Sequence, residues 1–337
     1  MVDATYKSFD AVDRSYHALI KKHAHQLALK AELPETRMAE LDIVVAEHTS
    51  NLAKYAQQGE LLIGHFKQSD SEYIELISLD NGPGMSDVPR MMADGFSSTN
   101  TIGHGLGSIK RLSDEFDIFS VREWGTIVVS RIYRTKPESK RRQKSDFRLS
   151  GLVVAKPNES TSGDGYYLKR TETHIKLLVA DGLGHGPEAN HAVNEAVKAF
   201  KTCPHDSPVE IIRYLHPEVR KTRGLVGTVV CIDLAAKQVG IAGVGNISAK
   251  LIGLSSLKSP LAYNGIIGHN IPNTMNDLLV RFEDYHQLTL CSDGIRSRWE
   301  AQKFPGLARA DLSIQAAAIY KDNARRTDDM SVITLKF

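Results

Sequence analysis

Four aspartates recur beside short turns in the second half of the chain. They are Asp164, Asp181, Asp293 and Asp328, in the sequences SGD, ADG, SDG and TDDMS. Each one alone is typical of a turn that ends a strand. Together at one end of a sheet they would repel one another unless cations lay among them. Carboxylates without clustered His or Cys favour Mg²⁺ or Mn²⁺, and two such ions can activate water and hold a phosphoryl group.

A different set of polar residues and glycines occurs in the first half. Glu47 and Asn51 are four residues apart in a helical pattern, so both side chains project from one face. Asp80 follows an apolar run, where its carboxylate can accept a hydrogen bond from an exocyclic amine. The glycine-rich residues 95–107 then lead into a helix and offer backbone amides to phosphates. This order of parts indicates a nucleotide site.

Two common nucleotide-binding motifs are excluded. The chain has no Gly-x-x-x-x-Gly-Lys-Ser/Thr sequence, so it contains no P-loop. The position expected to hold the third glycine of a dinucleotide-binding fingerprint is Ser108. In the second half, the stretch from Gly182 to Gly186 resembles a dinucleotide turn, but the preceding Asp181 and the other acids favour a metal site instead.

The apolar pattern predicts the elements that position these residues. Residues 41–55 have helical spacing, and Gly59 is expected to close that helix. Strands at 61–66, 73–79 and 125–133, with a helix near 108–114, make the first half α+β or α/β. The second half has strand-like runs at 166–170, 175–180, 227–233, 239–242, 249–253, 287–291 and 331–336. Helical patterns at 188–200 and 312–323 interrupt them, which favours sheets flanked by helices.

The length of 337 residues predicts two domains. Residues 134–148, RTKPESKRRQKSDFR, read as a solvated linker between domains at 1–133 and 149–337, although a basic run can also bind phosphates or acidic partners. The formal charges of the three segments are −6, +5 and +3, which give the net charge of +2. Such a balance argues against a nucleic-acid binder.

Composition also predicts where the protein acts. No apolar run is long enough for a membrane span, and the polar first 13 residues do not resemble a signal peptide. The three cysteines, Cys203, Cys231 and Cys291, are far apart, so neither disulfides nor a cysteine metal site is expected. We therefore expect a cytoplasmic protein without membrane attachment.

The order of parts in the first half resembles the GHKL ATPases. Within that group, KYAQQG, DNGPGM, DGFSST, GHGLGSIKRLSDEFDIFS and GTIVVSR resemble the RsbT-like switch kinases of bacterial partner-switching pathways, over about residues 41–134. The resemblance implies ATP and Mg²⁺ as cofactors and phosphorylation of Ser or Thr on STAS-domain proteins. It makes Asn51 the Mg²⁺ ligand and Glu47 the base. The expected nucleotide-binding residues are Asp80 at adenine, Gly82 and Gly84 around the pocket, Gly103, Gly105 and Gly107 at the phosphates, and Thr126 beside the adenine site.

The second half resembles the PP2C-type Ser/Thr phosphatases over about residues 151–337. The sequences DGLGHG, GVGNI, CSDGI and RRTDDMSVITL are most similar to the SpoIIE and RsbX branch. The resemblance implies two Mn²⁺ or Mg²⁺ ions, bridged by Asp181, with the Gly182 carbonyl on one of them. The metal site is then completed by Asp164, Asp293 and Asp328, with Asp329 as the other choice for the last ligand.

The second half also departs from the larger PP2C enzymes. No arginine stands just ahead of the Gly163–Asp164 pair to hold the substrate phosphate, so substrate grip is expected from the bound protein. His185 is interpreted as a turn residue, and the other reading is a proton donor to the leaving alkoxide.

These features predict an α+β protein of two domains, a GHKL ATPase α/β sandwich followed by a PP2C-like α-β-β-α sandwich. The leading hypothesis is a bifunctional regulator that phosphorylates and dephosphorylates STAS-domain proteins, with an anti-sigma factor or downstream effector as a further partner. One alternative is a phosphatase with a non-catalytic, ATP-sensing first half. Another is an ATPase of the chaperone or topoisomerase kind, which would need a transducer domain. His48 is not expected to be a phosphoacceptor, because no dimerisation helix pair precedes it.

Overall fold

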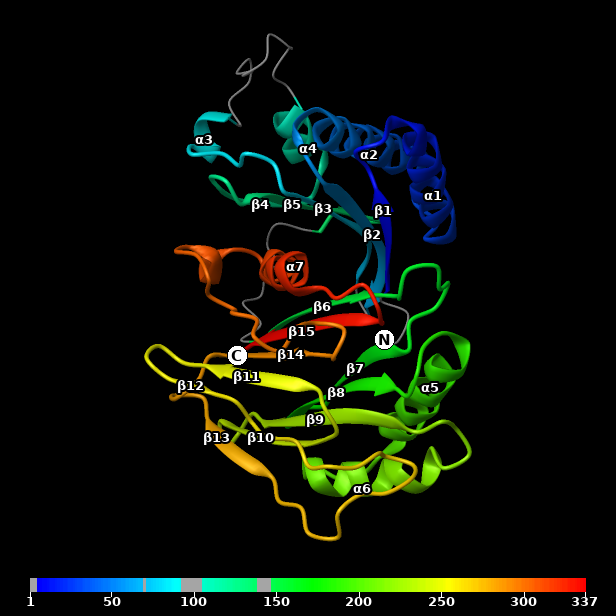
Figure 1. Ribbon diagram of the computed structural model, residues 1–337, viewed down its shortest axis with the longest axis vertical. Helices are drawn as coiled ribbons and strands as arrows, with labels where there is room; N and C mark the ends of the chain where they lie inside the picture. Colours follow the sequence, from blue (N-terminus) through cyan, green and yellow to red (C-terminus); the bar gives the residue numbers. More distant parts are fainter. Residues whose placement is uncertain (1–4, 69–70, 92–104, 138–146) are drawn as a thin grey trace. The chain divides into compact units, whose positions relative to one another are not determined.

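The computed structural model describes residues 5–68, 71–91, 105–137 and 147–337 (Figure 1). The chain divides into two compact units. The N-terminal unit consists of Tyr6–Gln143 and Gln302–Ala318, and the C-terminal unit of Met1–Thr5, Lys144–Ala301 and Ile319–Phe337. Residues 302–318, which the sequence places in the second domain, therefore pack with the first. Most of the predicted linker lies outside the described residues.

The N-terminal unit contains an antiparallel sheet. Its strands lie in the order β1 (Tyr6–Asp10), β2 (Gly59–Gln68), β3 (Ser71–Asp80), β5 (Gly125–Tyr133) and β4 (Glu115–Val121). Helices α1 (His17–Lys30) and α2 (Glu35–Tyr55) cover one face of it (Figure 1). A short 3₁₀ turn at Arg14–Tyr16 precedes α1, and two short helices, α3 (Val88–Met91) and α4 (Gly105–Leu112), follow β3.

The apolar stripe of α2 explains how this helix packs. Leu41, Val44, Val45 and Leu52 are buried, and they contact sheet residues such as Leu61 in one core cluster. The helix begins after Pro34, earlier than the pattern predicts. It ends at Tyr55, and Gly59 is the first residue of β2 rather than the helix terminus.

The C-terminal unit contains two five-stranded groups of antiparallel strands. One has the order β13 (Leu278–Arg281), β10 (Gln238–Val244), β9 (Leu225–Asp233), β8 (His174–Gly182) and β7 (Asp164–Arg170). The other has the order β12 (Leu257–Lys258), β11 (Ser248–Ile252), β14 (Gln287–Cys291), β15 (Met330–Lys336) and β6 (Arg148–Val154). The two groups of strands pack closely at Gly151 in β6, where any side chain would overlap the Tyr166 ring of β7.

Two helices cover the first of these sheets. Residues of α5 (Pro187–Thr202) and α6 (Pro208–Glu218) form one apolar core with β8 and β9, including Leu178, Phe200, Ile211 and Val229. The sequence predicted α5 but not α6. In α6, Ser207 caps the N-terminus by accepting a hydrogen bond from the Glu210 amide, while Pro217 within the helix obscures its pattern.

Other elements follow the sequence more closely. β5, β14 and α7 (Leu312–Asn323) have the predicted bounds. The N-terminal part of α7 belongs to the N-terminal unit, and Ile319 onward belongs to the C-terminal unit. The three cysteines are buried and unpaired. Among the described residues, no helix combines the length and apolar character that crossing a membrane requires.

Candidate active sites

Helix α2 directs two polar side chains at the start of α4. A side chain built on Gly105 would lie 2.9 Å from Glu47 Oε2 and 3.2 Å from Asn51 Oδ1. Glycine therefore leaves the space at this helix N-terminus open, and the structure brings Glu47, Asn51 and Gly105 together as the sequence predicts. Gly107 is buried within α4, and Gly103 lies outside the described residues.

The Asp80 carboxylate organises the turn after β3. Its Oδ1 accepts hydrogen bonds from the backbone amides of Gly82 (2.7 Å) and Thr126 (3.2 Å). Gly125, with φ +114°, passes so close to the Asp80 carbonyl that a side chain there would overlap it. Asp80 therefore holds the end of β3 and the start of β5 together.

Gly84 and Thr126 complete this region. Gly84 has φ +67°, and a side chain on it would overlap the Val121 carbonyl, so this turn requires glycine. Thr126 is buried, and its hydroxyl is 2.9 Å from that of Ser120. The Ser120 hydroxyl also accepts a hydrogen bond from the Met85 amide. Ser120, which the sequence reasoning did not single out, therefore links the glycine turn to Thr126.

His48 lies next to Glu47 in the chain but faces the core. It is 1 % exposed, and its ring nitrogens are each 2.9 Å from a serine hydroxyl, those of Ser78 and Ser130. Complete burial lowers the pKa of His48 to about 3. The side chain is a neutral, hydrogen-bonded core residue, which agrees with the expectation that it is not a phosphoacceptor.

Strand register brings the acids of the second half together. β7 and β8 pair so that Asp164 lies opposite Asp181. Asp293 follows β14 and Asp328 precedes β15, and these two strands are neighbours. Burial raises the pKa of Asp181 well above its ordinary value, and the charges of Asp164, Asp293, Asp328 and Asp329 raise it further. The predicted acids therefore lie within electrostatic range of Asp181.

Asp164 has an unsatisfied oxygen in this cluster. The residue is 1 % exposed, and its Oδ2 accepts a hydrogen bond of 2.6 Å from the Ser292 hydroxyl. Its Oδ1 is buried and has no hydrogen-bond partner. Burial raises the pKa of Asp164. A buried carboxylate oxygen without a donor is costly, and a hard cation is one group that would satisfy it.

Asp328 and Asp329 differ in how their carboxylates are used. Asp329 Oδ1 accepts from the Lys156 amide and Oδ2 from the Gly163 amide, both at 2.8 Å. Asp328 Oδ1 accepts from the Asp329 amide at 2.9 Å. Both oxygens of Asp329 therefore hold the backbone of the strand ends, which favours Asp328 as the residue that faces an ion.

Asn246, in the GVGNI sequence, is a further residue of this site that the sequence did not single out. Asn246 donates a hydrogen bond of 2.9 Å from Nδ2 to Asp293 Oδ2 and so orients that carboxylate. Gly182, at the end of β8, lies against the Ala189 carbonyl of α5, where a side chain would overlap it. Within the described ranges, no three His, Cys, Asp or Glu side chains are already arranged as a ligand set for one ion.

The turn after β8 carries an exposed polar pair. His185 Nδ1 is 2.7 Å from Glu159 Oε1, and the His185 side chain is 45 % exposed. Glu159 was not identified from the sequence. The contact is compatible with a turn residue and with a group that exchanges protons, so both readings of His185 stay predictions.

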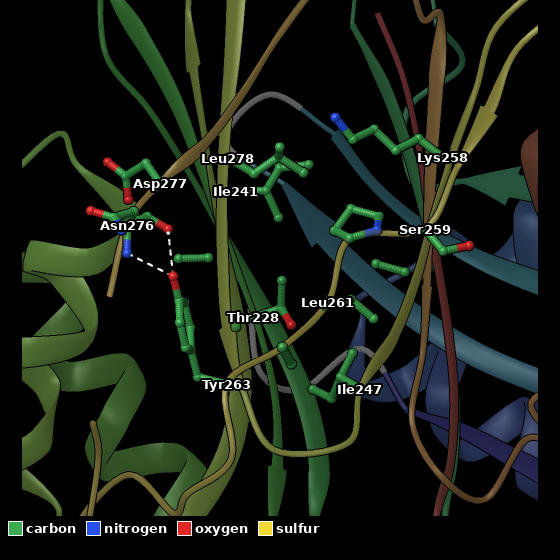
Figure 2. A pocket seen from close by; sticks show the side chains of 15 residues that line it. Thr228, Ile241, Ile247, Lys258, Ser259, Leu261, Tyr263, Asn276, Asp277 and Leu278 are labelled. Carbon is green, nitrogen blue, oxygen red and sulfur yellow. Dashed lines mark hydrogen bonds between the residues drawn. The ribbon is translucent and has the colours of Figure 1, made fainter. Parts of the chain in front are cut away.

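A separate cavity opens in the C-terminal unit. It has a volume of about 400 Å³ and lies between β9, β10 and residues 258–263 and 276–278 (Figure 2). Its lining is mostly apolar, and the Tyr263 hydroxyl accepts a hydrogen bond of 2.8 Å from the Asn276 amide at its edge. None of the predicted metal-site acids lines it. It is therefore distinct from the acidic cluster.

Comparison with known proteins finds several that are similar to this chain. Residues 11–132 match the model of the histidine kinase-like ATPase domain. The serine/threonine-protein kinase RsbT of Bacillus subtilis (strain 168) is 35 % identical over 88 residues, which make up 26 % of this chain and 66 % of RsbT. A solved structure from work on the bacterial stressosome, a modular system adapted to control secondary messenger signalling, is 30 % identical with a TM-score of 0.50. That match covers 56 % of this chain and 99 % of the other.

The N-terminal domain is therefore an RsbT-like ATPase domain, and the remainder of the chain has a PP2C-like phosphatase fold. RsbX, solved in complex with magnesium, is 19 % identical with a TM-score of 0.49, over 56 % of this chain and 94 % of RsbX. The RsbT-like domain contains Glu47, Asn51 and Asp80, and the PP2C-like fold contains the acidic cluster. The chain spans only 66 % of the length of RsbT.

Proposed function

We propose that the protein is a bifunctional regulator of a bacterial partner-switching pathway. Its RsbT-like domain phosphorylates Ser or Thr on a STAS-domain protein, and its PP2C-like domain removes phosphate from such a protein. The observation that carries this proposal is the buried Asp164 oxygen that has no hydrogen-bond partner, within the acidic cluster of Asp164, Asp181, Asp293, Asp328 and Asp329. The same chain places Glu47 and Asn51 beside Gly105 at the N-terminus of α4. An anti-sigma factor or a downstream effector is the further partner we propose.

In the RsbT-like domain, Asn51 would hold Mg²⁺ and Asp80 would bind the adenine of ATP. Bound Mg²⁺ neutralises charge on the phosphates. Glu47 would accept the proton of the substrate hydroxyl, because it lies beside Asn51 at the N-terminus of α4. Gly82, Gly84, Gly103, Gly105, Gly107 and Thr126 would shape the nucleotide pocket. The α4 N-terminus presents backbone N–H groups to the phosphates.

In the PP2C-like domain, the hard oxygen donors of the acidic cluster fit Mg²⁺ or Mn²⁺. Asp181 would bridge two ions, with the Gly182 carbonyl and the carboxylates of Asp164, Asp293 and Asp328 around them. Two such ions supply an activated water and neutralise the phosphoryl group. Asn246 and Ser292 orient Asp293 and Asp164, and Asp329 holds the Lys156 and Gly163 amides in place.

The two activities are tested on the full chain. STAS-domain proteins that co-purify with it are incubated with radiolabelled ATP and Mg²⁺, and the phosphoprotein product is then incubated with Mn²⁺. We expect Asn51→Ala to abolish phosphorylation only and Asp181→Ala to abolish dephosphorylation only, each by about 100-fold or more. Lys54→Ala on α2 and Asp233→Asn, at the opposite end of the β8–β9 pair from Asp181, are the matched controls.

The results separate the proposal from its rivals. Loss of both activities in either variant would contradict two independent sites. Tight ATP binding without any transfer would favour the alternative of a non-catalytic, ATP-sensing domain beside a phosphatase. Transfer from ATP to water alone, with no phosphoprotein, would instead favour an ATPase of the chaperone or topoisomerase kind.

A further inference from the structure

The loop that leads into β9 lies beside the turn that follows Asp181. In the β8–β9 pair, Val226 is opposite Asp181 and Leu225 is opposite Gly182. The pairing continues past the strand ends, because the Leu183 amide donates a hydrogen bond of 3.1 Å to the Gly224 carbonyl. The residue before Gly224 is therefore placed next to the turn that follows Asp181.

That residue is Arg223, and its guanidinium reaches the turn. A side chain built on Gly184 would lie 3.0 Å from Arg223 Nη1. Gly184 has φ +86°, a conformation that favours glycine, so the turn leaves this space to the arginine. Gly184 is three residues after Asp181 in the chain, so the guanidinium lies beside the turn that follows one of the predicted metal ligands.

The backbone at Arg223 is held firmly while its side chain is not used. The Arg223 carbonyl accepts a hydrogen bond of 2.8 Å from His269 Nε2, and the Gly224 amide donates to the Thr222 hydroxyl at 3.0 Å. The side chain itself is exposed and makes no hydrogen bond or ion pair with any residue that the structure describes. The Arg223 guanidinium is therefore available to an anion, and the fixed backbone limits where it can bind one.

We infer that Arg223 binds the phosphate of the phosphoserine or phosphothreonine substrate of the PP2C-like domain. This inference rests on the proposed function and deepens it. The planar guanidinium fork matches two oxygens of a phosphate monoester, and its charge offsets the dianion. No arginine stands just ahead of the Gly163–Asp164 pair, and Arg223, in the loop before β9, would take its place. The substrate phosphate is then bound by a residue of this chain, and its binding does not depend only on contacts with the rest of the substrate protein.

The first test measures the kinetics of the full chain with Mn²⁺, using para-nitrophenyl phosphate and a phosphoserine peptide. Arg223→Ala is expected to raise KM by about 10-fold or more, because the charged hydrogen bonds to phosphate are lost. Arg223→Lys, which keeps the charge without the fork, should fall between wild type and Arg223→Ala. Arg220→Ala is the matched control, because Arg220 is exposed in the same loop. It should change KM by less than about twofold.

The second test needs no turnover. Isothermal titration calorimetry of inorganic phosphate should show about 10-fold weaker binding to Arg223→Ala, and titration of Mn²⁺ should show unchanged affinity. Unchanged KM and phosphate affinity in Arg223→Ala would overturn the inference. So would an equal loss of Mn²⁺ affinity, since it would mark a structural role. If wild type binds phosphate through Arg223 but hydrolyses no phosphoprotein, the proposed phosphatase activity fails while the phosphate site stands.

Discussion

At the scale of single residues, polar side chains in this protein divide into those that the fold satisfies and those that it leaves for ligands. His48 has a serine hydroxyl at each ring nitrogen, and both oxygens of Asp329 accept backbone amides. Asp164 Oδ1 and the Arg223 guanidinium have no such partner within the described residues. Buried polar groups are normally paired, so the buried Asp164 oxygen indicates where an ion is expected, while the exposed Arg223 guanidinium is available to a phosphate.

His48 predicts how the RsbT-like domain responds to acid. Its pKa is about 3 in the folded protein and about 6.5 in the unfolded chain, so the unfolded state binds more protons at any pH between these values. Stability is therefore full above pH 6.5 and falls as the pH is lowered toward 3. We expect a loss of about 2 kcal/mol between pH 7.5 and pH 5.0 from this residue.

The measurement compares wild type with His48→Gln, which cannot ionise. Urea unfolding of the full chain is followed by hydrogen exchange of the α2 amides at both pH values. The pH-dependent loss should be smaller in His48→Gln by about that amount. His25→Gln, at a histidine whose side chain is 45 % exposed, serves as the control. Equal losses in wild type and His48→Gln would contradict the prediction.

At the scale of elements, a largely buried arginine, Arg131, holds residues 302–318 in the N-terminal unit. Arg131 of β5 donates two hydrogen bonds to Asp311, at 2.7 and 3.0 Å, and one to the Ser313 hydroxyl at 2.8 Å. It also pairs with Glu75 and Glu115. Burial alone would lower the Arg131 pKa, but Glu75 and Asp311 raise it well above its ordinary value. The acids around Arg131 therefore offset the cost of burying its charge.

Asp311→Ala is expected to destabilise the N-terminal unit by about 2 kcal/mol. It removes the bidentate partner of Arg131 and leaves part of a buried guanidinium without acceptors. Glu32→Ala removes one of the two acidic partners of the half-exposed Arg134, the other being Glu72, and should cost less than about 1 kcal/mol. Urea unfolding monitored by hydrogen exchange of β5 amides compares the two. A similar small effect in both variants would show that the Asp311 pair adds little to stability.

At the scale of the whole molecule, the units that fold together are not consecutive stretches of sequence. Residues 302–318 follow most of the C-terminal unit in the chain but belong to the N-terminal one. Besides Asp311, this segment contributes Phe304, whose ring centroid is 4.9 Å from that of Trp124. Cutting the chain at the basic segment would therefore leave the RsbT-like domain without one of its own parts.

A fragment of residues 1–137 is expected to unfold at lower urea concentration than the same residues in the full chain. Without residues 302–318, it exposes Trp124 and leaves Arg131 short of acceptors. Adding a synthetic peptide of residues 302–318 should raise the unfolding midpoint, measured by Trp124 fluorescence. The same peptide with Asp311→Ala is the control and should raise it less. A fragment as stable as the full chain would contradict the prediction.

The sequence by itself determined most elements and the identity of most candidate site residues. Apolar periodicity is local, so β5, β14 and α7 had the predicted bounds. The half-buried β4 and the proline-containing α6 lack such a pattern and were missed. Asp164 and Asp181 stood out because acids beside glycine at strand ends are local signals.

Only the tertiary structure decided how distant residues combine. Strand register set Asp164 opposite Asp181 and placed Arg223 beside Gly184, and hydrogen bonds distinguished Asp328 from Asp329. The tertiary structure also shows that residues 302–318 belong to the N-terminal unit. Such pairings depend on hydrogen bonds, charge pairs and ring packing between segments far apart in the chain. No pattern within one segment records that gain.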